Sequence, residues 1–272
     1  MKTVLVTGAA GSLGSEIVDI LIQRGEKVLA FDNNEAGLFQ LLYKNYPKAR
    51  FTQVYGDIRD YARIHYAMAE ADICIHTAAM KNLEITESAI TEMIQTNVIG
   101  TDNVARAAKS CGVECAILVS TDKVVNPNSA YGAGKLLAEE IWKGAARQNP
   151  MQRFVVFRSG NFKHSAGNVL EIWQRQHEKG EMLTVTDPEM ERHFIDTRKA
   201  AEIMCDIPQY AKSGDTIIPK MERKNIMDLM REEFPGAAYR LVGCRQGEKT
   251  KEQLKTEDEK VIWEDDNVQV IE

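Results

Sequence analysis

The chain has 272 residues, 44% of them hydrophobic and 27% charged, values that are ordinary for a globular protein with one or two domains. The formal net charge of −6 argues against a nucleic-acid partner, and no apolar run approaches the ~20 residues that span a bilayer, so membrane insertion is not expected. The five cysteines are odd in number and scattered, which predicts free thiols, no metal site and a reducing, cytoplasmic setting.

Short apolar runs alternate with longer amphipathic runs through the first 160 residues. The runs with strand character are residues 3–7, 27–31, 51–55, 72–76, 114–120 and 153–159. Between them, residues 13–24, 90–110 and 130–147 have helical periodicity. Several strand runs are apolar almost throughout, as expected for parallel strands that are covered on both faces. The alternation predicts an α/β fold with a doubly wound parallel sheet, whose nucleotide-binding part is residues 1–160.

The pattern becomes irregular after residue 160. A helix is predicted over residues 170–179, followed by short strands and a charged tail. Residues 161–272 are therefore predicted to form mainly a small C-terminal substrate-binding lobe, with part of 190–220 returning to the main sheet.

A glycine-rich turn, TGAAGSLG, joins the first predicted strand to the first predicted helix. Glycines at this spacing permit a tight turn and close approach of the backbone to a pyrophosphate, which lies at the helix N-terminus. The predicted cofactor contacts in this turn are Gly8, Ala10, Gly11, Ser12, Leu13 and Gly14. Asp32 ends the next strand, where a carboxylate can bind the ribose hydroxyls and repel a 2′-phosphate, and neither Asn33 nor Asn34 is basic. NAD is therefore favoured over NADP.

A second motif follows the fifth predicted strand. Tyr131 and Lys135 are four residues apart at the start of a predicted helix, so their side chains share one face. A nearby ammonium favours the phenolate, which would let Tyr131 accept a proton from a sugar hydroxyl.

Several stretches together resemble the extended short-chain dehydrogenases/reductases, and within them the UDP-N-acetylglucosamine 4,6-dehydratases of bacterial polysaccharide biosynthesis. Beyond the two motifs above, these stretches are 78–81 (AAMK), 96–101 (TNVIGT), 120–124 (STDKV), 160–161 (GN), 183–190 (LTVTDPEM) and 243–249 (GCRQGEK). The resemblance implies an NAD(P)-binding Rossmann fold and covers nearly the whole chain. It also implies further cofactor contacts from Asp57, Ile58, Ala78, Ala79, Lys81 and Asn97, together with Tyr131 and Lys135.

The resemblance implies a redox-neutral reaction. Such enzymes oxidise the sugar at C-4, eliminate water across C-5 and C-6, and return the hydride to C-6. Carried over, Tyr131 is the base for the C-4 hydroxyl, Lys123 the base at C-5 and Asp122 the acid for the leaving hydroxyl. Thr121 would hydrogen-bond the C-4 oxygen, and Lys135 would tune Tyr131 and hold the nicotinamide ribose. C-5 inverts if Lys123 reprotonates the opposite face.

The nucleotide-sugar substrate is expected to contact five residues by the same resemblance: Lys81, Asn161, Arg192, Arg245 and Glu248. The chain departs from the family's usual pattern at residues 82–84 and 163–168, where the sugar should lie, so the exact sugar stays open. Two other readings also stay open, a nucleotide-sugar epimerase or reductase of the same fold and a non-catalytic NAD-binding regulatory protein. A homo-oligomer that pairs through helices 90–110 and 130–147 is expected, since related enzymes commonly pair there.

Overall fold

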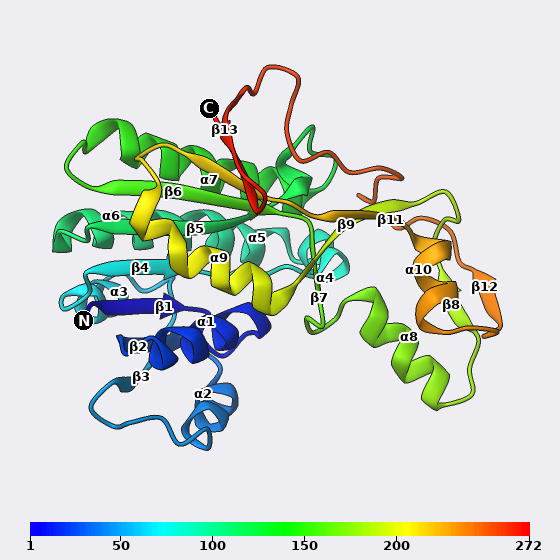
Figure 1. Ribbon diagram of the computed structural model, residues 1–272, viewed down its shortest axis with the longest axis horizontal. Coiled ribbons are helices and arrows are strands. Elements are labelled where there is room, and N and C mark those ends of the chain that lie inside the picture. Colours follow the sequence, from blue (N-terminus) through cyan, green and yellow to red (C-terminus); the bar gives the residue numbers. More distant parts are fainter.

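The computed structural model describes all of residues 1–272 and is built around a nine-stranded sheet with the order β13-β14-β10-β6-β5-β4-β1-β2-β3 (Figure 1). Seven strands, from β10 to β3, are parallel, and β14 and β13 add antiparallel strands at one edge. The strands are β1 (Thr3–Thr7), β2 (Lys27–Asp32), β3 (Phe51–Tyr55), β4 (Ile73–His76), β5 (Cys115–Thr121), β6 (Arg153–Ser159), β10 (Thr216–Pro219), β13 (Val261–Glu264) and β14 (Val268–Ile271). The predicted doubly wound α/β fold is confirmed.

Helices cover both faces of this sheet, as the apolar parallel strands require. One face is covered by α1 (Ser12–Gln23), α2 (Glu35–Leu42) and α9 (Thr197–Tyr210), and the other by α3 (Tyr61–Met68), α6 (Gly100–Cys111) and α7 (Ala130–Gln148). Each face has its own buried apolar cluster, centred on side chains such as Ile17 and Met204 on one side and Trp142 on the other. Burial of these side chains is the main source of stability that holds the layers together.

The single helix predicted over residues 90–110 is interrupted in the structure. The chain passes through α4 (Leu83–Ser88), α5 (Ile90–Met93) and a π-helical turn η1 (Ile94–Ile99) before α6 begins. Asn97 lies within this π turn and is fully buried. Single π turns often occur at functional sites, because they redirect side chains away from regular helical positions.

A smaller part of the molecule lies beyond the carboxyl ends of the parallel strands, beside the main sheet (Figure 1). It contains β7 (Asn161–Lys163), β9 (Glu191–Asp196) and β11 (Glu222–Asn225) in one sheet, β8 (Leu183–Val185) and β12 (Tyr239–Leu241) in another, and helices α8 (Val169–Glu178) and α10 (Ile226–Glu233). A third apolar cluster, with Trp173 at its centre, holds α8 and α10 against β8.

The return of the chain to the main sheet goes further than the sequence predicts. Helix α9 and strand β10 lie within the predicted 190–220 stretch, but β13 and β14 also join this sheet. Both strands are only four residues long and follow a charged stretch, so their pattern is too short to stand out. No helix in the structure is both long and apolar enough to cross a membrane.

Candidate active site

A cavity of about 910 Å³ opens at the carboxyl ends of the parallel strands. It lies where the strand order reverses between β1 and β4, which is the usual ligand position in doubly wound sheets. The predicted residues that line it are Gly8, Ala10, Gly11, Ser12, Leu13, Gly14, Asp32, Asp57, Ile58, Ala78, Ala79, Lys81, Thr121, Lys123, Tyr131, Lys135 and Asn161. Folding therefore brings most of the predicted cofactor and catalytic residues around one cavity.

The glycine turn between β1 and α1 has the conformation that its sequence predicts. Gly8 has φ +68°, a region that favours glycine, and its carbonyl accepts a hydrogen bond from Gly11 N at 3.0 Å. A Cβ on Gly14 would lie 2.1 Å from the same carbonyl oxygen, so α1 packs against the turn too closely for any side chain. Loop 163–168 approaches the turn from the smaller part, where Ala166 N donates to Ser12 Oγ at 3.0 Å.

Two carboxylates line the same cavity as this turn, Asp32 at the end of β2 and Asp57 after β3. Asp32 ends β2, and its two oxygens accept hydrogen bonds from Ala10 N at 2.9 Å and Asn34 N at 2.8 Å. Each oxygen keeps a second acceptor position, so the carboxylate can still receive a hydroxyl from a ligand. The Arg59 guanidinium donates hydrogen bonds to both carboxylate oxygens of Asp57. These bonds lower the Asp57 pKa by more than partial burial raises it, so the pKa lies below its usual value. Arg59 is a cavity residue that the sequence analysis did not single out.

The loop after β4 forms another wall, with Lys81 among its lining residues. Asn97 does not line the cavity but anchors this loop: its side chain accepts from Met80 N and donates to Met80 O, both at 2.8 Å. The structure therefore shows Asn97 supporting the wall of the cavity and not among its lining residues. Lys81 has no ion-pair partner, and its partial desolvation lowers its pKa.

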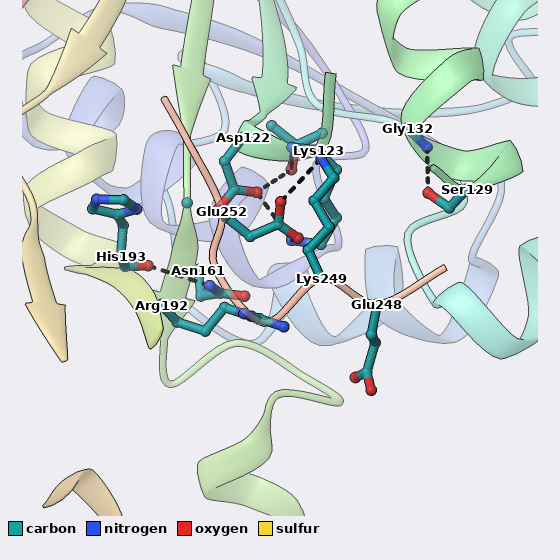
Figure 2. A network of polar contacts seen from close by, with 12 residues as sticks. Asp122, Lys123, Ser129, Gly132, Asn161, Arg192, His193, Glu248, Lys249 and Glu252 are labelled. Carbon is teal, nitrogen blue, oxygen red and sulfur yellow. Dashed lines mark hydrogen bonds and ion pairs between the residues drawn. The ribbon is translucent and has the colours of Figure 1, made fainter. Parts of the chain in front are cut away.

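Three polar residues follow one another where β5 ends. Thr121 and Lys123 line the other end of the cavity, whereas Asp122 is fully buried and is not among the lining residues. Figure 2 shows Asp122 and Lys123. Lys123 Nζ donates to Asp122 Oδ1 at 2.9 Å, and the Thr121 hydroxyl donates to the same oxygen at 3.0 Å. The Asp122 side chain is fully buried, and its second oxygen has no hydrogen-bond partner. The 3₁₀ turn η2 (Asp122–Val124) is capped by Thr121, which accepts from Lys123 N. This capping turn fixes Asp122 and Lys123 beside one another.

Tyr131 and Lys135 occupy the first two turns of α7. Ser129 caps this helix by accepting from Gly132 N at 3.0 Å. A Cβ on Gly132 would lie 2.5 Å from the carbonyl oxygen of Lys123, so the glycine allows the first turn of α7 to approach η2. This contact brings the buried Tyr131 next to the Thr121–Lys123 segment.

The sequence predicts that the ammonium beside Tyr131 belongs to Lys135, but in the structure the ammonium that acts on the phenol is that of Lys123. Burial raises the pKa of the Tyr131 phenol, and the ammonium that opposes this effect belongs to Lys123. Lys135 instead donates to Val119 O at 2.5 Å, and burial lowers its pKa to about 8. For Lys123, burial lowers the pKa, but the carboxylates of Asp122 and Glu252 outweigh it and leave the pKa raised.

Three of the five predicted substrate residues do not line the cavity. Arg192 is buried on β9, where its Nη1 donates to Glu191 O and Thr250 O. Arg245 is partly exposed and pairs with Glu84 at 3.1 Å. Its backbone N–H also donates to Glu248. These contacts place Arg245 and Glu248 on a loop outside the cavity, whereas Lys81 and Asn161 line it.

Glu252 is the main site residue that the sequence analysis missed. It lies in a run of charged residues, EKTKE at 248–252, where nothing indicates which charge is buried. In the structure its side chain is 1% exposed and lies 3.8 Å from Lys123 Nζ.

A Rossmann-type sheet with a glycine turn after β1, and with Tyr131 and Lys135 on α7 beside the same cavity, matches the class of extended short-chain dehydrogenases/reductases. Within this class the chain belongs to the family described as "Polysaccharide biosynthesis protein", whose profile matches residues 4–271.

Individual relatives agree with this assignment. The chain is 32% identical to a UDP-N-acetylglucosamine 4,6-dehydratase (inverting) from Campylobacter jejuni, over 99% of this chain and 82% of the relative. It is 31% identical to a UDP-glucose 4-epimerase from Rickettsia bellii, over 97% and 80%. Among solved structures, Pen from Bacillus thuringiensis superposes with a TM-score of 0.93 and 29% identity, covering 99% of this chain and 89% of that one.

Proposed function

We propose that the protein is an NAD-dependent nucleotide-sugar 4,6-dehydratase, with UDP-N-acetylglucosamine or a close relative as substrate. The observation that carries this proposal is the hydrogen-bonded pair of Asp122 and Lys123 beside Tyr131. An epimerase or reductase has no elimination to perform and needs no such acid–base pair. A non-catalytic NAD-binding protein has no need of Tyr131 either.

The cavity fits a dinucleotide cofactor. The turn at Gly8 and the close packing of Gly14 leave room for a pyrophosphate at the N-terminus of α1. Asp32 is placed to receive ribose hydroxyls, and its charge disfavours the 2′-phosphate of NADP. Lys135 would hold the nicotinamide ribose. When bound, the nicotinamide supplies a hydride acceptor for C-4 and a hydride donor for C-6.

Proton movements are assigned to residues at the end of β5 and the start of α7. Tyr131 takes the proton of the C-4 hydroxyl, whose oxygen Thr121 holds by a hydrogen bond. Oxidation at C-4 acidifies the C-5 proton, which Lys123 then removes, and Asp122 protonates the C-6 hydroxyl so that it leaves as water. Lys123 must be neutral and Asp122 protonated for this step. Passage of one proton along their 2.9 Å hydrogen bond produces both forms.

Substrate contacts are proposed from Lys81 and Asn161, because both line the cavity and Lys81 has no ion-pair partner. A cation without a protein partner is well suited to the diphosphate of a nucleotide sugar. The epimerase alternative is favoured by the similarity to the Rickettsia bellii relative. It differs in its product, because an epimerase leaves the mass of the sugar unchanged.

The test is to incubate the purified protein with UDP-N-acetylglucosamine and to examine the product by mass spectrometry and proton NMR. We expect the loss of one water and a new methyl doublet without added reductant. Tyr131→Phe should abolish turnover while leaving NAD binding intact. An unchanged sugar beside clear NAD binding would refute this substrate assignment, and a product of unchanged mass would favour the epimerase.

A further inference from the structure

Glu252 comes from the C-terminal segment and lies beside Lys123, although the two residues are far apart in the sequence (Figure 2). Its Oε1 lies 3.8 Å from Lys123 Nζ, and its Oε2 lies 3.3 Å from Lys249 Nζ. The side chain is 1% exposed, and Oε2 has no hydrogen-bond partner. A carboxylate buried in this way loses its hydration, so its position needs compensation from the neighbouring cations.

The segment that carries Glu252 is fixed by one backbone hydrogen bond and two side-chain hydrogen bonds. Glu191 N donates to Thr250 O at 2.9 Å, and Arg192 donates to the same oxygen at 3.2 Å. Lys249 Nζ donates to Val125 O at 2.7 Å, directly after η2. Glu252 is therefore held in place from both β9 and the loop after η2.

Four charges alternate in sign along this cluster, from Asp122 through Lys123 and Glu252 to Lys249. Lys123 thus lies between two carboxylates that favour its ammonium form. Arg192 on β9 acts in the opposite direction, and the phenol of Tyr131 faces Lys123 from α7. His193, also on β9, faces Asp122 and Glu252 and carries a lowered pKa because it is partly buried.

We propose that Glu252 is a positioning residue for the elimination step, which holds the Lys123 amine in place and sets its basicity towards C-5. The role depends on the proposed dehydratase chemistry. When Lys123 takes the C-5 proton it becomes an ammonium, and the adjacent carboxylate stabilises that charge. A stronger base removes a carbon-bound proton faster, but it gives up its own proton to Asp122 less readily. The Glu252 charge favours protonation of the Asp122–Lys123 pair as a whole, so the limbs of the pH–rate profile lie at higher pH when Glu252 is present. Lys249 partly neutralises Glu252 and limits the effect.

The experiment measures deuterium incorporation at C-5 during turnover of UDP-N-acetylglucosamine in D₂O, over a range of pH. We expect Glu252→Gln to shift the acid limb of the pH profile of deuterium incorporation to lower pH, by about one pH unit or more. The rate on the plateau of that profile should also fall, with KM unchanged. Lys249→Gln keeps a donor for Val125 O and should move the limb upward. Glu259→Gln is the matched control, because it removes a carboxylate from the same segment that pairs with Arg158 instead.

A Glu252→Gln enzyme with the wild-type acid limb would overturn the inference. If that variant does not fold, the Lys249→Gln variant provides the test. A shift of its acid limb to higher pH supports the role of Glu252, and an acid limb at the wild-type pH overturns the inference. A shift of the same size in Glu259→Gln would assign the effect to loss of structure and overturn it as well. Wild-type protein that releases no water and incorporates no deuterium would instead refute the proposed function, before any variant is compared.

Discussion

The tight packing between Gly14 and the Gly8 carbonyl provides the most direct test of the cofactor site. In Gly14→Ala the new Cβ would lie 2.1 Å from Gly8 O and 2.9 Å from the Cα of Ala9. Contacts below 3.0 Å essentially do not occur, so the turn or α1 must move by about 1 Å. Both contacts are with backbone atoms, which cannot rotate away as a flexible side chain would.

That movement falls on the turn expected to receive the pyrophosphate. A misplacement of about 1 Å costs on the order of 100-fold where geometry is optimised, so we expect the Kd for NAD to rise at least about tenfold. Overpacking should also lower the free energy of unfolding by about 1–3 kcal/mol. Calorimetric titration with NAD and thermal unfolding measure the two effects.

The matched control is Gly144→Ala in α7. There the nearest atom to the new Cβ is Arg147 Nη2 at 3.8 Å, an ordinary contact. Replacing glycine by alanine inside a helix is expected to add about 1 kcal/mol of stability, and NAD affinity should not change. If Gly14→Ala bound NAD as tightly as the wild type, the assignment of this turn as the pyrophosphate site would be wrong.

Two further predictions concern stability and assembly. Hydrogen bonds and charge from the Arg158 guanidinium lower the pKa of Glu259 by more than partial burial raises it, so this pKa lies below its usual value. The pair therefore stabilises the folded state fully at pH values above the unfolded-state pKa near 4.5. This stabilisation is lost as the pH falls through the folded-state pKa. Glu259→Gln should therefore lower the free energy of unfolding by about 1–3 kcal/mol at pH 7, and the difference from wild type should shrink below about pH 4.5 in urea unfolding curves. Ile99 and Leu137 are 43% and 53% exposed on the two helices expected to pair, so Leu137→Glu should convert a dimer to a monomer in sedimentation at micromolar concentration. A wild-type protein that sediments as a monomer would contradict this expectation.

The sequence predicts the central sheet well because the relevant signals are local. Most of the parallel strands are short, nearly unbroken apolar runs, and each boundary falls within one residue of the prediction for the first six strands. The cofactor turn and the Tyr131–Lys135 pair are equally local, since each is contained within a few residues. The exception is the helix predicted over 90–110, where the buried Asn97 and its contacts with Met80 accompany a π turn that periodicity does not reveal.

The parts that could not be predicted depend on contacts between distant residues. Arg192 has the residue type of an anion contact, but in the structure its guanidinium donates to the carbonyl oxygens of Glu191 and Thr250. Glu252 looks like one solvated charge among many, and only the folded chain places it beside Lys123. Strand β14 is likewise recognised only from its pairing with β10, and β13 only from its pairing with β14.

The arrangement around Tyr131 connects the two halves of the proposed reaction. Its phenol faces the Lys123 ammonium, whereas Lys135 is engaged with the Val119 carbonyl. The cation that eases deprotonation of Tyr131 therefore belongs to the same pair that is proposed to carry out the elimination. When Lys123 gives its proton to Asp122, both the ammonium that favours the phenolate and the carboxylate that opposes it are neutralised. The ammonium has the larger effect, so the phenol becomes harder to ionise. Oxidation at C-4 is thus favoured while the pair is charged, and elimination is favoured after the proton has moved, which gives the two steps an order.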